Sequence, residues 1–307
     1  METSATLIAS SALRRHAILC VLGASACYSI TGALVKAVSA EFPTAEIVLF
    51  RSFVAVLVTL PLLRRHGGLA ALRTRRPWGH LARTITGFAG MITSYYGYAT
   101  LPLAINTALG FAMPLLLTLL SVPLLGERVG WRRACVVLVG LAGVLVVVRP
   151  WHHAADSLPL FPVAVVLLGV VAWALSMISI RRMGEVGESN VAIVLWFSFG
   201  ATAMGAAMTV PVWQTPDALQ LSALIAVGVI TGLAQLLMTE GYRSGEPSLV
   251  APFEYGAILY TTVLGMAIWN EIPDAWNIVG IVIIIASGLY VWQFEAGPGR
   301  RGAAKGG

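Results

Sequence analysis

Residues 104–125 read AINTALGFAMPLLLTLLSVPLL, a stretch of 22 residues without a charged side chain. An apolar run of about 20 residues, wound into an α-helix, spans the roughly 30 Å hydrocarbon core of a bilayer. Pro114 lies deep in this run and removes one helix hydrogen bond, which membrane helices tolerate. The stretch therefore predicts a helix that crosses a membrane.

Nine more runs of this kind flank the stretch, and short connections separate them. Hydrocarbon offers the backbone no hydrogen-bond partner outside its own segment, so each run must be helical. We predict an all-α polytopic membrane protein with ten transmembrane helices. The runs are Ala17–Val38, Glu46–Leu63, Trp78–Thr100, Ala104–Leu125, Arg133–Val148, Pro159–Ile180, Val191–Val210, Ala218–Arg243, Ser248–Trp269 and Ala275–Phe294.

The composition agrees with a lipid environment. Of the 307 residues, 58% are hydrophobic and only 11% are charged, whereas a soluble domain carries about 25% charged residues. The net charge of +6 could favour nucleic acid, but no basic stretch is interleaved with exposed aromatic residues. We expect a lipid bilayer and a small-molecule substrate as partners, no nucleic acid, no cofactor and no metal.

The basic residues predict the orientation. If the N-terminus lies inside, all but four of the 20 lysines and arginines fall in inner connections or at the termini. Lys36 and Arg149 lie outside, and Arg51 and Arg83 lie within runs. This bias is what the positive-inside rule expects of ten spans, so we place both termini in the cytoplasm.

The second half of the chain repeats the first. Tyr98 and Tyr242, and likewise Glu127 and Glu271, are 144 positions apart. The correspondence predicts two five-helix repeats, at 1–150 and 151–307. Because five is odd, the second repeat must be inverted relative to the first, an arrangement typical of secondary transporters.

Several of these stretches resemble the EamA-type carriers of the drug/metabolite transporter superfamily. They are Tyr96–Leu103 (YGYATLPL), Pro114–Trp131 (ending LLGERVGW), Val139–Val146 (VGLAGVLV) and Tyr242–Asp274, which contains APFEYGAILY and NEIPD. The second half is most similar to S-adenosylmethionine and riboflavin carriers. The resemblance implies two inverted five-helix repeats and alternating access to a central cavity.

Four ionisable residues within the runs stand out as candidates, namely Arg51, Arg83, Glu240 and Glu254, because a charge inside a membrane span costs roughly 2.5–3.5 kcal/mol on insertion scales. By topology Arg83, Glu240 and Glu254 share the inner third of the membrane. We hypothesise that Arg83 pairs with Glu254 or Glu240 in an inner gate or at the floor of the substrate site. The alternatives are a static pair, or long side chains that reach the interface.

The fourth residue, Arg51, lies near the outer end of its run. It could meet an anionic cargo from outside or pair with Glu46, and a structural role is the alternative. Glu127 and Glu271 occupy matching helix ends, where we interpret them as residues that cap and fix the turns.

Backbone features and aromatic residues add to the candidate site. Pro114 and Pro252 predict kinks that could line a cavity, with ordinary packing kinks as the alternative. Gly87, Gly90 and Ser94 form a small-residue face that predicts close helix packing. Aromatic side chains within the runs could stack on a planar or cationic cargo, although many such residues face lipid or other helices. They are Tyr95, Tyr98, Phe111, Trp173, Trp196, Phe253, Tyr255 and Tyr260.

These observations favour a secondary carrier of the bacterial inner membrane that moves a small organic metabolite. A vitamin-like or nucleoside-like cargo such as S-adenosylmethionine or riboflavin is expected, and an amino acid or organic anion is the alternative. His152, His153 and Asp156 could serve a membrane-embedded enzyme, but a solvated loop is favoured there and we expect no enzyme. Pairing of two copies through an apolar helix face stays open.

Overall fold

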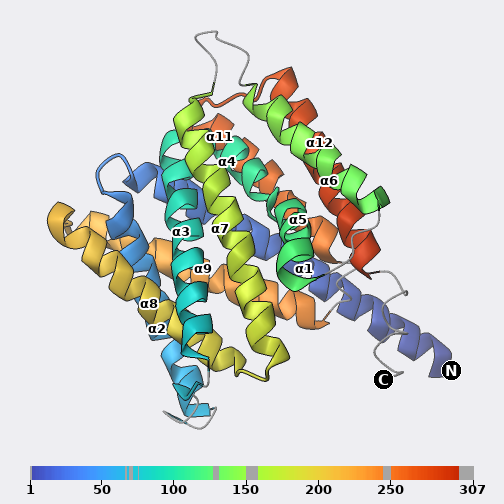
Figure 1. Cartoon of the computed structure of the whole chain (residues 1–307), viewed down its shortest axis with the longest axis horizontal. Coiled ribbons are helices and arrows are strands. Elements are labelled where there is room, and N and C mark those ends of the chain that lie inside the picture. The colour runs from blue at the N-terminus through green and yellow to red at the C-terminus, as the bar shows by residue number, and fades with distance from the viewer. Residues whose placement is uncertain are drawn as a thin grey trace.

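The computed structural model describes residues 2–65, 68, 72–74, 76–126, 131–149, 158–244 and 250–296. Within these ranges every regular element is helical, and the helices form one bundle (Figure 1). The expected all-α class is confirmed. Glu127 and the loop residues His152, His153 and Asp156 lie outside the described residues.

A helix occupies each of the ten runs. In the described residues five helices are long and apolar enough to cross a membrane, among them the joined segment Leu103–Leu125. Two more, Ala134–Val148 and Ala275–Tyr290, are apolar but shorter. The elements are α1 (Glu2–Val38), α2 (Thr44–Arg65), α3 (Pro77–Thr100), α4 (Leu103–Gly110), α5 (Met113–Leu125), α6 (Trp131–Val148), α7 (Leu160–Glu185), α8 (Asn190–Thr209), η2 (Val210–Val212), α9 (Ala218–Ser244), η3 (Ala251–Tyr255), α11 (Gly256–Trp269) and α12 (Ala275–Ala296).

The fourth and ninth runs are irregular, as their prolines predict. α4 ends at Gly110 and α5 starts at Met113. Pro114 has no N–H with which to continue the helical ladder back to Gly110. In the matching run of the second half, Pro252 lies in the 3₁₀ helix η3, which precedes α11. Both breaks lie beside the central cavity described below.

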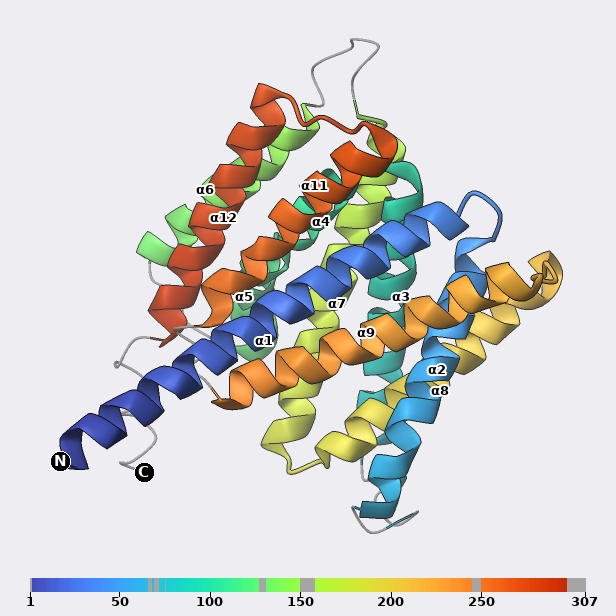
Figure 2. The same ribbon diagram turned by 180° about the vertical axis from the view of Figure 1, so that it is seen from behind.

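The largest helix interfaces all join the first half of the chain to the second. α3 packs along α7, α1 along α9, α6 along α12 and α2 along α8; Figure 2 shows α1 beside α9 and α6 beside α12. The α3–α7 and α1–α9 interfaces correspond to each other under the repeat. In each of them, the third helix of one half packs along the first helix of the other half. The halves are therefore interlocked.

Glycines allow close backbone approach at these interfaces. A Cβ atom on Gly90 of α3 would lie 3.0 Å from the carbonyl oxygen of Gly169 on α7. A Cβ atom on Gly280 of α12 would lie 2.8 Å from the carbonyl oxygen of Gly143 on α6. Since lipid is as apolar as the side chains, such close packing replaces the hydrophobic effect in holding membrane helices together. The packing face expected on α3 is confirmed at Gly90.

Candidate functional site

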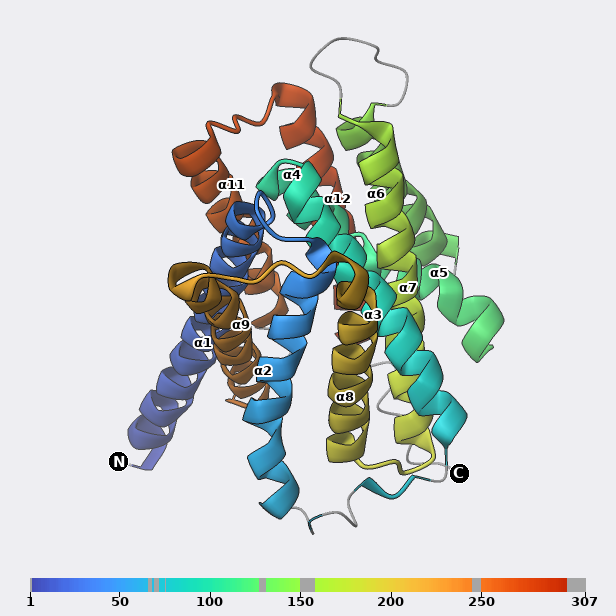
Figure 3. The same ribbon diagram turned by 90° about the vertical axis from the view of Figure 1, so that its left-hand side faces the viewer.

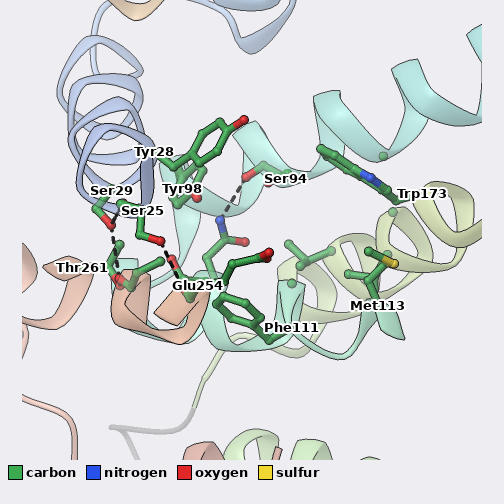
Figure 4. Close-up of a pocket in the computed structure, with 18 of the residues that line it drawn as sticks. Ser25, Tyr28, Ser29, Ser94, Tyr98, Phe111, Met113, Trp173, Glu254 and Thr261 are labelled. Carbon is green, nitrogen blue, oxygen red and sulfur yellow. Dashed lines mark hydrogen bonds between the residues drawn. The ribbon is translucent and has the colours of Figure 1, made fainter. Parts of the chain in front are cut away.

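A cavity of about 310 Å³ lies at the centre of the bundle, between the two halves (Figure 4). Its wall comes from α1, α3, α4 and α5 of the first half and from α7, α9, η3 and α11 of the second. Most of the lining is apolar or aromatic, with scattered hydroxyl and amide groups. A concave, mainly apolar pocket with a few polar groups is the usual form of a small-molecule site.

Glu254 supplies the one carboxylate among the described residues of the cavity wall. It lies in η3, where the helix is irregular, and its carboxylate accepts a hydrogen bond from the hydroxyl of Tyr242 on α9. The backbone carbonyl of Glu254 accepts a bond from Ser25 on α1 (Oγ to O, 3.4 Å). These contacts hold the carboxyl-bearing turn against α1 and α9. The expectation that Glu254 belongs to the substrate site remains a hypothesis.

α1 contributes a polar stripe that the sequence analysis missed. Ser25, Tyr28 and Ser29 all line the cavity. Ser29 donates to the carbonyl of Ala257 at the start of α11 (3.2 Å), and Tyr28 donates to Gln235 on α9 (Oη to Oε1, 2.8 Å). The signal was present in the sequence, because residues three and four apart share one helix face and these are polar in an otherwise apolar run.

Arg83 lies away from both carboxylates that were proposed as its partners. Its Nη1 donates to the hydroxyl of Ser176 on α7, and its guanidinium lies 3.9 Å from the ring centre of Phe197 on α8. Within the described residues no ion pair joins Arg83 to Glu254 or Glu240. The reason is the direction of each side chain around its helix: Arg83 contacts α7 and α8, whereas the Glu254 carboxylate contacts Tyr242 on α9. Depth along the helices, which the sequence provides, does not fix this direction.

Glu240 lies near the surface of the bundle. Its carboxylate is 3.6 Å from Nε2 of His16 on α1, and the two side chains are 44% and 58% exposed. It also accepts a bond from the Ser244 hydroxyl (2.7 Å). Glu240 is not among the described residues that line the cavity, which fits the more peripheral position that the sequence gave it.

Arg51 is not paired with Glu46. Its Nη1 is 2.8 Å from the sulfur of Met91 on α3. The fully buried Glu46 accepts the backbone N–H of Gln214 instead (3.1 Å). Arg51 therefore contacts α3 instead of the Glu46 carboxylate.

Three of the candidate aromatic residues line the cavity: Tyr98, Phe111 and Trp173. In Figure 4 Glu254 lies near Phe111, with Trp173 toward the opposite end. Tyr255 stacks on Phe111 from behind, with ring centres 4.5 Å apart and an angle of 28°.

The other aromatic candidates lie elsewhere. Tyr95 is buried beside Tyr98 at an edge-on angle of 60°, and Tyr260 is not among the described lining residues. Trp196 lies against His80. Phe253 packs on the buried cluster around Val21.

One end of the bundle is joined across the halves by ion pairs of lysine and arginine with carboxylates; we call it the Glu271 end. Lys36 of α1 pairs with Glu271 and donates to the carbonyl of Leu101 (2.8 Å). The second carboxylate oxygen of Glu271 accepts the N–H of Leu103, the first residue of α4 (2.9 Å). Glu271 thus caps α4, a helix of the other half. Its own backbone N–H also bonds the carbonyl of Gly265 at the end of α11. Arg149 pairs with Asp274 at the same end.

The opposite end, which we call the Glu240 end, is joined across the halves by histidines. Besides the His16–Glu240 pair, the buried His80 at the start of α3 lies 3.2 Å from Glu188, between α7 and α8. Figure 3 shows the starts of α1 and α3 and the α7–α8 connection together at the lower end. Arg182 near the end of α7 donates to the carbonyl of Leu124.

The chain matches the sequence profile described as "EamA-like transporter family" twice, at residues 15–149 and 160–292. The chain belongs to the EamA-like transporter family. The resemblance noted in the sequence is confirmed, and the two matched segments carry the two sets of helices that line the cavity. The family is one of membrane transporters, and the relatives described below are named as transporters. The protein is therefore a transporter rather than an enzyme.

Curated relatives of this EamA-like chain have several cargoes. It is 31% identical to the pseudopaline exporter CntI of Pseudomonas aeruginosa, over 93% of this chain and 99% of that protein. It is 28% identical to an S-adenosylmethionine uptake transporter of Rickettsia prowazekii, over 87% and 89% of the two chains. It is 26% identical to a riboflavin transporter of Vibrio cholerae, over 92% and 95%.

A crystal structure with a TM-score of 0.61 covers 91% of this EamA-like chain and 97% of its own. At 19% sequence identity this likeness concerns the fold alone.

Proposed function

We propose that the protein is a secondary active transporter that moves a small organic metabolite across the bacterial inner membrane by alternating access to the central cavity. The observation that carries the proposal is the position of that cavity, which is walled by corresponding helices of two matched halves. A site between repeats can be exposed to either side when one repeat rocks against the other.

The full proposal has ten spans in two inverted repeats, residues 1–150 and 151–307. The exchange of the α3–α7 and α1–α9 interfaces under the repeat correspondence supports it. The distribution of lysine and arginine supports cytoplasmic termini. In this topology the Glu271 end faces outward and the Glu240 end faces the cytoplasm.

The outer route to the cavity is closed by contacts between the halves in this proposal. A small hollow of about 90 Å³ extends toward Glu271 and shares Thr261 with the central cavity. Lys36 and Glu271 pair at its outer side. Opening to the outside would require the two halves to part there, and a ligand shifts such an equilibrium only by binding one state more tightly.

For the cargo we propose a vitamin-like or nucleoside-like metabolite, of the kind named for the S-adenosylmethionine and riboflavin relatives. The aromatic cavity wall supports a flat ring in the cargo. The amino-acid or organic-anion alternative fits less well, because the described lining residues include no lysine or arginine.

The test begins with a thermal-shift screen of the purified protein in detergent against vitamins, nucleosides, amino acids and organic acids. A ligand at a hundred times its Kd stabilises the folded state by about 2.7 kcal/mol. Radiolabelled hits are then followed in proteoliposomes preloaded with the unlabelled compound. Exchange that needs the protein supports the carrier, and binding without exchange for every hit would contradict it.

A further inference from the structure

Building on the proposed transport function, we propose that the central cavity selects a cargo that carries a positive charge beside a flat ring, with Glu254 as the group that recognises the charge.

The described residues of the cavity lining include an acidic side chain but no basic one. Glu254 contributes a carboxylate, while no lysine, arginine or histidine lies among the described lining residues. The Tyr242 hydroxyl, which is an uncharged donor, forms a hydrogen bond with one oxygen of this carboxylate. A carboxylate in a largely apolar site is costly without an opposite charge nearby. A cationic cargo supplies that charge from within the cavity.

The arginines of the bundle do not take this place. Arg83 is held by Ser176 and Phe197, between α3, α7 and α8. Arg51 contacts Met91 on α3, and it is not among the described residues that line the cavity. Neither forms an ion pair with Glu254 in the described residues.

The aromatic side chains near Glu254 favour the same kind of cargo. Phe111, backed by Tyr255, and Tyr28 offer ring faces on neighbouring walls. A cation over an aromatic face gains about 0.5–2 kcal/mol, most where water is excluded. A flat ring has Trp173 and Tyr98 against which to stack. The volume of about 310 Å³ is at the lower end for ligand sites, so the cargo is small.

The test uses three probes that share an indole ring and differ in charge: tryptamine (positive), indole-3-ethanol (neutral) and indole-3-acetate (negative). Their affinities for the full-length protein in detergent are measured by isothermal titration at neutral pH. We expect tryptamine to bind at least tenfold more tightly than the alcohol, and the acetate to bind most weakly. Glu254→Gln should bring tryptamine and the alcohol within about twofold, and Glu254→Asp should keep the preference.

Two controls keep the result interpretable. Glu185→Gln makes the same chemical change on the exposed end of α7, beside Arg181, and should leave the order of affinities unchanged. Melting curves without probe establish that each variant is folded. Equal binding of the three probes, or tightest binding of the acetate, would overturn the cation proposal. Tight tryptamine binding with no exchange of any cargo in proteoliposomes would instead overturn the transport function and leave the charge preference standing.

Discussion

Among the described residues, the two ends of the bundle differ in the kind of side chain that pairs with a carboxylate across the halves. At the Glu271 end these side chains are Lys36 and Arg149. The Lys36–Glu271 pair is also largely buried, at 12% and 18% exposure, and carries two backbone contacts.

At the Glu240 end the corresponding partners are histidines, His16 with Glu240 and His80 with Glu188. The comparison indicates that the Glu271 end is held by lysine and arginine ion pairs, while the Glu240 end is held by contacts between imidazole and carboxylate groups. The predictions below test this difference.

The largest effect is expected at Glu271. Glu271→Gln keeps an acceptor for the Leu103 N–H but leaves the buried Lys36 without its counter-charge. We expect the free energy of unfolding to fall by about 3 kcal/mol, the lower end for a broken buried pair. Thermal melting in detergent measures the loss.

A double variant separates the pair from the packing around it. Lys36→Met combined with Glu271→Gln removes both charges, so most of the lost stability should return. A Glu271→Gln protein as stable as the wild type would show that the Lys36–Glu271 pair does not stabilise this end of the bundle.

A smaller loss is expected from His80→Leu at the other end. The change keeps side-chain volume but leaves the Glu188 carboxylate without the imidazole contact of 3.2 Å. Loss of a buried polar contact costs about 1–3 kcal/mol, to be read from melting curves at pH 7. An unchanged melting temperature would mean that the histidine contact contributes nothing to the joining of the halves.

The smallest effect is expected for Asp274→Asn. Burial raises the pKa of Asp274, but hydrogen bonds from the backbone N–H of Asn277 and from Arg149 lower it more, so the pKa lies below its ordinary value. Its stabilising effect is therefore present at neutral pH and disappears as pH falls through that lowered pKa. Because the side chain is 45% exposed, the loss should stay under about 1 kcal/mol. A wild-type–variant difference in melting temperature that persists below about pH 2 would contradict this assignment.

The sequence predicted the helices and their breaks because both follow from local chemistry. Apolar runs of bilayer length, and the missing N–H groups of Pro114 and Pro252, do not depend on what surrounds them. The close packing at Gly90 was also predictable, since a small-residue face in a membrane helix has few other uses.

The composition of the cavity was only partly predictable. Depth along a helix follows from counting residues, but the direction of a side chain around the helix depends on the neighbouring helices. For this reason Arg83 and Glu254, expected to meet, project to different neighbours. The α1 residues Ser25 and Tyr28 were missed because neither is charged, although their spacing places them on one polar face of the helix.

The interlocking of the halves has a consequence for how the chain is made. α1, α2, α3 and α6 each have their largest partner in α9, α8, α7 and α12, all of which are synthesised later. The helices of the first half are therefore made before the surfaces that complete them exist, and the close contacts of Gly90 with Gly169 and of Gly143 with Gly280 form only later. The bundle can therefore be completed only after the last helix has been made. A chain that stopped after the first half would lack the helices against which its own helices pack.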